Sequence, residues 1–167
     1  MTLMPQVLPL AAVNSLPLDD FLEFFGSLYG SALWVPVMAF EHRPFMSVED
    51  LVQTLGEIAA TAHPRAKEEL LGLQPDFLKD SPRRPAAERR ATAKLTREEI
   101  RTLTKLQLAY AKKFGFPLVL ALDGRGPEDW EAASARLENT PEQEVTNSLD
   151  EMNRLVRLRV TEKVTAA

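Results

Sequence analysis

The chain has 167 residues, of which 45% are hydrophobic and 26% are charged, and its net charge is −4. This composition is typical of one globular domain with a sizeable core. The absence of cysteine excludes disulfides, thiolate nucleophiles and cysteine-ligated metals, and two histidines are too few for a multi-histidine zinc site. We therefore expect a single domain over residues 1–167, with flexible ends at 1–14 and 165–167 and with no bound metal.

The N-terminal stretch Met1–Val13 lacks a basic start and is interrupted by Pro5 and Pro9, which argues against a signal peptide. No run approaches the roughly 18 apolar residues of a membrane span. We expect a cytoplasmic protein that does not bind a membrane.

Charge is distributed unevenly along the chain. Residues 79–113 hold eleven Lys/Arg and four Asp/Glu, a local charge of +7, so the remainder carries −11. Such a basic segment is either the solvated face of a helix or a site for an anion. The acidic remainder would repel phosphates, and Tyr110 is the first aromatic residue of the segment, too late to provide stacking surfaces among the basic residues. We expect no nucleic acid partner.

Helical patterns recur through the first half of the chain. The first, Leu18–Gly30, carries its apolar residues at i, i+3, i+4 and i+7. The next apolar stretch, 32–40, is interrupted by Pro36. Ser47-Val48-Glu49-Asp50 resembles a capping box with Asp in place of Glu. It predicts a helix that ends at about Ala62, since the residue before a proline avoids the α region.

The second half combines helices with a loop and one extended run. Thr96-Arg97-Glu98-Glu99 and Thr140-Pro141-Glu142-Gln143 are capping boxes that open long helices. The predicted segments are a short helix at 66–73, a long loop at 74–86, a helix from 96 to 114, a buried extended run at 118–122, a helix at 127–137 and a final helix to about Val164. Roughly seven or eight helices without βαβ alternation predict an all-α, single compact domain.

The two histidines, His42 and His63, are the candidates for acid–base chemistry near neutral pH. His63 precedes Pro64, where a helical pattern stops, and the alternative role is a helix-end residue hydrogen-bonded to the backbone. His42 lies in a polar loop, where we expect a structural or solvent-exposed role. Lys113–Pro117 places two aromatic residues around Gly115 and ends in a proline, which predicts a stiff loop whose backbone amides a small polar ligand can use.

The apolar stripe of the last predicted helix continues into an arginine. The position that follows Leu155 and Val156 on this stripe is Arg159, whereas Arg154 and Arg157 face solvent. A buried charge needs a partner, so Arg159 either forms an internal salt bridge, snorkels near the helix end, or clamps a ligand anion. We favour the ligand.

Several motifs, in their order along the chain, resemble those of one family. They are Leu18-Asp19-Asp20-Phe21, the stretch from Trp34 to His42-Arg43-Pro44-Phe45, Ala62-His63-Pro64, Leu106–Pro117, Arg136-Leu137-Glu138-Asn139 and Leu158-Arg159-Val160. The longest motif is close to the most specific signature of the 2-oxo-4-hydroxy-4-carboxy-5-ureidoimidazoline (OHCU) decarboxylase family, with Gln107 where that family usually has Asn. The chain resembles this family from Leu18 to Val164.

The resemblance implies an all-α enzyme of urate breakdown that decarboxylates OHCU to (S)-allantoin without a cofactor. By the match, His63 is the catalytic acid–base group and Arg159 is the active-site arginine, which clamps an anionic part of the substrate. The resemblance also implies a homodimer and a small anionic ureidoimidazoline as the substrate. The residues implied in substrate binding are Gln107, Phe116, Pro117, Leu118, Val119 and Leu120.

The Ser-x-x-Glu-Gln motif of the family, which supplies a catalytic glutamate, is not in register here. Counting back from Leu95, the glutamate position falls on Ala86, and Glu88 is the nearest carboxylate, two residues later. We expect Glu88 to orient His63 or the ureido group of the substrate if its loop folds inward. The alternative is a catalytically silent or re-purposed member that binds a small anionic metabolite, because four arginines stand in this region: Arg83, Arg84, Arg89 and Arg90.

Overall fold

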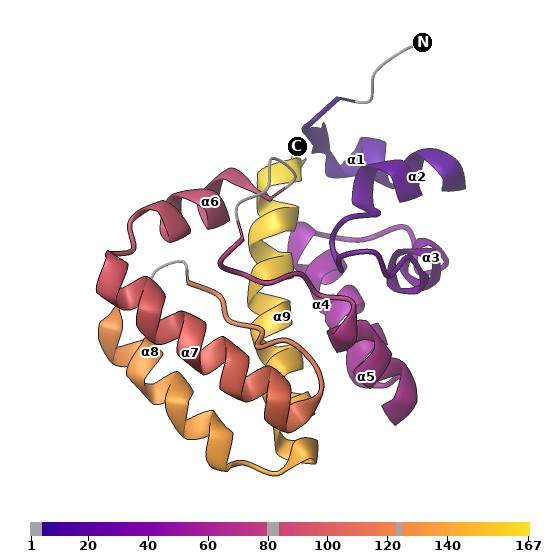
Figure 1. Cartoon of the computed structure of the whole chain (residues 1–167). Coiled ribbons are helices and arrows are strands. Elements are labelled where there is room, and N and C mark those ends of the chain that lie inside the picture. The colour runs from indigo at the N-terminus through magenta and orange to yellow at the C-terminus, as the bar shows by residue number, and fades with distance from the viewer. Residues whose placement is uncertain (1–4, 80–83, 123–124) are drawn as a thin grey trace.

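The computed structural model describes residues 5–79, 84–122 and 125–167, and Figure 1 shows that these form a helical protein. Its elements are β1 (Leu8–Pro9), α1 (Leu10–Val13), α2 (Leu18–Phe25), α3 (Trp34–Phe40), α4 (Val48–Ala60), α5 (Pro64–Gly72), α6 (Ala86–Ala93), α7 (Arg97–Phe114), α8 (Pro127–Ser134), the 3-10 turn η1 (Ala135–Glu138), α9 (Pro141–Lys163) and β2 (Val164–Thr165). The predicted all-α class is confirmed. No helix of the described ranges is long and apolar enough to cross a membrane.

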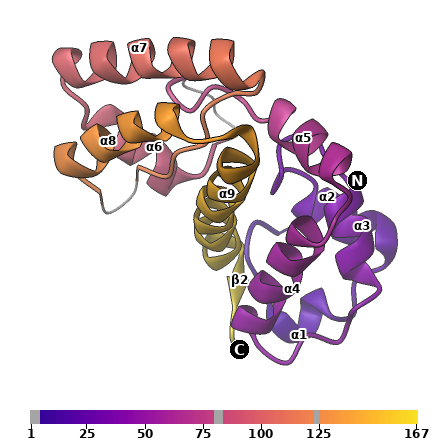
Figure 2. The same ribbon diagram turned by 90° about the horizontal axis from the view of Figure 1, so that it is seen from below.

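Helix α9 runs through the middle of the molecule. Figures 1 and 2 both show α6, α7 and α8 on one side of it and α1 to α5 on the other. Its predicted apolar stripe is buried, with Met152, Val156 and Val160 almost fully inaccessible to solvent. Residues from both halves therefore pack against one helix and share one hydrophobic core.

The helix starts follow the capping signals of the sequence. The Ser47 hydroxyl accepts the Asp50 N–H, while Thr96 and Thr140 each form the complete reciprocal capping box. Helix α7 ends at Gly115, whose φ of +81° is the left-handed conformation that glycine adopts most readily. The following run, 118–122, is buried and is neither helix nor strand, as predicted.

Two local predictions are wrong, and one helix was not predicted. Pro36 does not interrupt the stretch 32–40, because it lies in the first turn of α3, where a helix tolerates proline. The predicted loop 74–86 agrees with its described residues to within one position, since α6 begins at Ala86; α6 itself is a helix for which the sequence offers no apolar stripe. Helix α2 ends at Phe25 rather than near Gly30, which takes a φ of +65° in the following turn.

The two ends of the chain pair with each other, so the predicted flexible end at 1–14 is too long. Leu8 pairs with Val164 and Pro9 pairs with Thr165, in parallel register. Thr165 belongs to the predicted flexible end at 165–167. Farther along, the Asn14 side chain donates to the Phe45 carbonyl oxygen at 3.0 Å and accepts the Phe45 N–H at 2.8 Å. The described part of the N-terminal segment is therefore held by the core and by the last strand.

Candidate active site

A small cavity lies between α6, α9 and the extended run 118–122. Its volume is about 40 Å³, which holds roughly three water molecules. The lining residues are Gln74, Pro75, Phe77, Arg84, Glu88, Leu118, Val119, Leu120, Leu122, Leu155 and Arg159. Five of the residues predicted from sequence, Glu88, Leu118, Val119, Leu120 and Arg159, are thus brought together in one place.

Arg159 forms a paired ionic contact with Glu88 in the wall of this cavity. Its Nε lies 3.1 Å from Glu88 Oε2 and its Nη2 lies 2.9 Å from Oε1, while Nη1 donates to the Leu28 carbonyl oxygen at 2.6 Å. The side chains of Arg159 and Glu88 are only 12% and 5% exposed. Of the roles considered from the sequence, the internal salt bridge is therefore formed, because α6 brings Glu88 to Arg159.

Glu88 is positioned by the first turn of α6, where the positive end of the helix dipole favours a carboxylate. The Ala87 N–H donates to Glu162 Oε1 at 3.0 Å, so the first turn of α6 has a second contact with α9 besides the Glu88–Arg159 pair. Glu88 therefore turns inward, which is the condition that its expected role required. In this structure, however, its two oxygens meet Arg159, and no contact with His63 is formed among the described residues.

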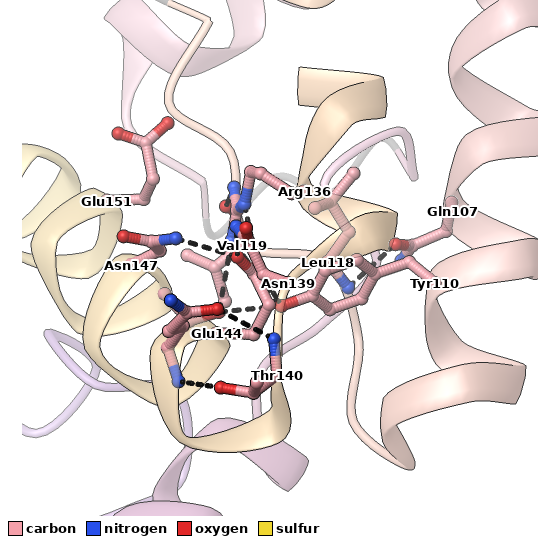
Figure 3. A network of polar contacts seen from close by, with 12 residues as sticks. Gln107, Tyr110, Leu118, Val119, Arg136, Asn139, Thr140, Glu144, Asn147 and Glu151 are labelled. Atoms are coloured by element: carbon pink, nitrogen blue, oxygen red, sulfur yellow. Dashed lines mark hydrogen bonds and ion pairs between the residues drawn. The ribbon is translucent and has the colours of Figure 1, made fainter. Parts of the chain in front are cut away.

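Two hydrogen bonds from residues outside the cavity hold the extended run that forms its opposite wall. Gln107 Oε1 accepts the Leu118 N–H at 2.8 Å, and Arg136 Nη1 donates to the Val119 carbonyl oxygen at 3.0 Å. Figure 3 shows that the side chains of Gln107 and Arg136 reach this run from different elements, α7 and η1. Gln107 thus lies behind the wall and does not line the cavity.

Arg136 belongs to a buried polar network centred on Glu144. The Glu144 carboxylate accepts from four side chains, and the donor–acceptor distances are 2.6 Å for Tyr110, 2.8 Å for Arg136, 2.8 Å for Asn139 and 2.7 Å for Asn147. Burial opposes the ionisation of Glu144, but the hydrogen bonds of these four donors hold its pKa below its ordinary value. An ionised, fully satisfied carboxylate therefore anchors the network.

The tyrosine of this network remains a hydrogen-bond donor. Burial and the hydrogen bond to Glu144 both raise the pKa of the Tyr110 phenol. Its ring also packs against Phe116, with ring centroids 5.8 Å apart. Phe116 is thus a buried packing residue, and Pro117 follows it half-buried; neither lines the cavity.

Neither histidine lines the cavity in the described part of the chain. His63 is the exposed N-cap of α5, and its Nδ1 accepts the Arg65 N–H at 3.2 Å. This contact matches the alternative considered from sequence, a helix-end residue bonded to the backbone, and it leaves Nε2 to carry the proton of the neutral ring. His42 is exposed, with Nδ1 at 3.0 Å from the Met38 carbonyl oxygen, as expected for a structural residue.

Sequence reasoning missed part of this site. Glu144, Ser148 and Glu151 are buried polar residues on α9, and the signal that singled out Arg159, a polar residue on a buried face, applies to them as well. Arg84 lines the cavity and donates to Lys79 and Thr92, whereas Arg83 lies outside the described residues.

Comparison with known proteins identifies the family. A sequence model described as OHCU decarboxylase matches residues 14–161. The 2-oxo-4-hydroxy-4-carboxy-5-ureidoimidazoline decarboxylase of Haloferax volcanii is 31% identical, over 93% of this chain and 96% of that protein. The chain belongs to the OHCU decarboxylase family. The resemblance seen in the motifs is confirmed.

Two crystal structures share the fold of this OHCU decarboxylase family member. One, of (S)-allantoin synthase, has a TM-score of 0.71 and 22% sequence identity, and the match covers 94% of this chain but only about half, 54%, of that chain. The other, of OHCU decarboxylase in the presence of (S)-allantoin, has a TM-score of 0.66 and 20% identity, covering 82% of this chain and 94% of that one.

Proposed function

We propose that this protein decarboxylates OHCU to (S)-allantoin in urate catabolism. The observation that supports this most strongly is the family match along nearly the whole chain, together with the end-to-end similarity to the Haloferax volcanii decarboxylase. The cavity adds chemical support, because its apolar wall faces a guanidinium and a carboxylate. Such a lining suits a small anionic heterocycle with polar edges.

The reaction needs no cofactor, because the substrate can stabilise its own intermediate. The bond between the ring carbon and the carboxylate carbon breaks, CO₂ leaves, and the electron pair is delocalised into the adjacent ring C=N. One proton is then delivered to one face of the ring carbon that bears the ureido group, which sets the configuration of the product. The hydroxyl proton moves to the ring nitrogen, and the hydroxyl carbon becomes the carbonyl of allantoin. The protein has to neutralise charge on the ring and present the proton donor to that face.

In this proposal Arg159 and Glu88 form the polar end of the site. Among the described residues, the contacts of Arg159 use three of its five N–H groups, so the remaining N–H groups can bind an anionic part of the substrate. Glu88 fixes the guanidinium and accepts from the ureido group. A cavity of about 40 Å³ has to widen before it admits an imidazoline.

His63 is proposed as the proton donor, on the strength of its match to the His-Pro motif of the family. Its ring is exposed, and Nε2 is the nitrogen from which the proton would pass, since Nδ1 accepts the Arg65 N–H. We further propose a cytoplasmic homodimer that binds neither nucleic acid nor membrane, as expected from composition and from the resemblance.

The test uses OHCU generated freshly from urate in the cuvette. The purified protein should accelerate the loss of the ultraviolet signal over the buffer rate and should yield (S)-allantoin, measured by circular dichroism. His42→Asn is the matched control for His63→Asn, because His42 is exposed and also hydrogen-bonded to the backbone. Unaccelerated decay to racemic allantoin would overturn the proposal.

A specific observation favours a second candidate, a re-purposed member that binds a small anionic metabolite without turnover. Glu88 is held by Arg159, and His63 is outside the cavity lining in the described part of the chain. In that case (S)-allantoin should raise the melting temperature of the protein while OHCU decays at the buffer rate. Acceleration that depends on His63 would exclude this candidate.

A further inference from the structure

The two walls of the cavity are held by different kinds of contact. Helix α6 is fastened to α9 by the Glu88–Arg159 pair and by the Ala87 N–H on Glu162. The run 118–122 is instead fixed by hydrogen bonds to its own backbone from Gln107 and from Arg136. A wall whose main chain is bonded at two consecutive residues cannot shift or rotate without breaking a buried hydrogen bond.

The Arg136 contact is itself rigid. Its Nε donates to Glu144 at 2.8 Å and its Nη2 donates to Ser148 at 3.1 Å, so three nitrogens of one planar group are fixed at once. Glu144 and Ser148 are fully buried on α9, the helix that also carries Arg159. One helix therefore sets the position of both the polar end of the cavity and its apolar wall.

We propose that Gln107 and Arg136 are positioning residues for the decarboxylation, which hold the Leu118–Leu122 wall at a fixed place relative to Arg159. This inference rests on the proposed function. Neither residue lines the cavity, so each acts through the main chain of the wall.

The consequence is kinetic as well as structural. A misplacement of about 1 Å of a positioning group can lower a rate about 100-fold, even when the change lies outside the reacting groups. A residue that only stabilised the fold would leave the kinetics of the folded protein unchanged. The two roles separate when all variants are assayed well below their melting temperatures.

The main variant is Gln107→Met, which keeps the shape of the side chain and removes the oxygen that accepts the Leu118 N–H. Gln107→Glu is the conservative variant, because it keeps an oxygen at the same reach. Arg136→Lys tests the other anchor, since an ammonium cannot bond Glu144, Ser148 and the Val119 carbonyl together. Leu51→Ala, in α4 on the opposite side of α9, is the control that loses stability without touching the wall.

We expect Gln107→Met and Arg136→Lys to lower kcat/KM about 10- to 100-fold and to weaken (S)-allantoin binding measured by calorimetry. Gln107→Glu should recover most of the loss, and Leu51→Ala should keep wild-type kinetics. Hydrogen–deuterium exchange of the 116–122 peptide should quicken in the first two variants. Unchanged kinetics and exchange in Gln107→Met, with an active wild type, would overturn the inference.

An inactive wild type would instead contradict the proposed function, and the exchange measurement separates the two failures. Exchange that quickens in Gln107→Met but not in Leu51→Ala supports the fixed wall without any reference to turnover. With an inactive wild type, equal exchange in the two variants shows that Gln107 does not fix the wall, and the inference is then refuted as well.

Discussion

Replacing Arg159 by methionine removes a buried cation from a contact with both oxygens of Glu88. The N–O distances of 3.1 and 2.9 Å and the low exposure of both side chains leave little solvent to replace the lost charge. Removing one member of a buried pair costs about 3–5 kcal/mol, because the other charge stays buried and unpaired. At about 3 °C per kcal/mol for a chain of this size, the melting temperature should fall by about 9–15 °C.

The matched control is Arg157→Met, two residues earlier on the same helix. Arg157 pairs with Glu49, but the two side chains are 52% and 61% exposed, so water and salt screen the contact. Calorimetry and urea titration of both variants, at neutral pH and moderate salt, should show a large loss for Arg159→Met and almost none for Arg157→Met.

A double variant tests the reason for the loss. If the cost of Arg159→Met comes from an orphaned carboxylate, adding Glu88→Leu should restore most of the stability, since a buried ion pair replaced by apolar residues is often neutral. Equal melting temperatures for Arg159→Met and Arg157→Met would refute the reasoning. The arginine would then be available to a ligand anion without a structural cost, as first expected from the sequence.

The elements that could be predicted from the sequence are those set by local contacts. Ser47, Thr96 and Thr140 cap helices within three residues of themselves, and each helix begins where its cap predicts. Helix α6 could not be predicted in this way. It is rich in polar residues, and Glu88 and Ala87 of α6 contact Arg159 and Glu162, which are more than seventy residues away in the chain.

The features of the site also differ in whether they depend on local spacing or on the packing of distant elements. The stripe of α9 placed Arg159 on the inner face, which depends only on helical spacing, whereas its partner depends on how α6 docks. The proline after His63 likewise predicts a helix end at about Ala62, and α4 ends at Ala60; that His63 caps the start of α5 does not follow from this spacing. The position of His63 relative to the cavity depends on the packing of α5, for which the sequence carries no local signal.

Three further predictions concern carboxylates and the histidine. His63→Asn should lower turnover by roughly 10²–10⁴ with the melting temperature kept, whereas His42→Asn should change neither; equal steady-state rates for wild type and His63→Asn would end the proposed proton transfer. Glu88→Gln should slow turnover more than Glu98→Gln, since Glu98 is an exposed first-turn residue of α7, and a neutral Glu88→Gln would leave the carboxylate role vacant. The last concerns acid stability. Burial opposes the ionisation of Glu144, yet its four donors hold its pKa in the folded protein below the ordinary 4.5. A lowered folded pKa stabilises the protein above the unfolded pKa, and that contribution is lost as the pH falls through the folded value. The melting temperature of the wild type should therefore exceed that of Glu144→Gln by the largest amount at pH 7. This difference in melting temperature should narrow steadily below about pH 4.5. A gap of constant size from pH 7 to pH 3 would show that the ionised carboxylate is not what the network stabilises.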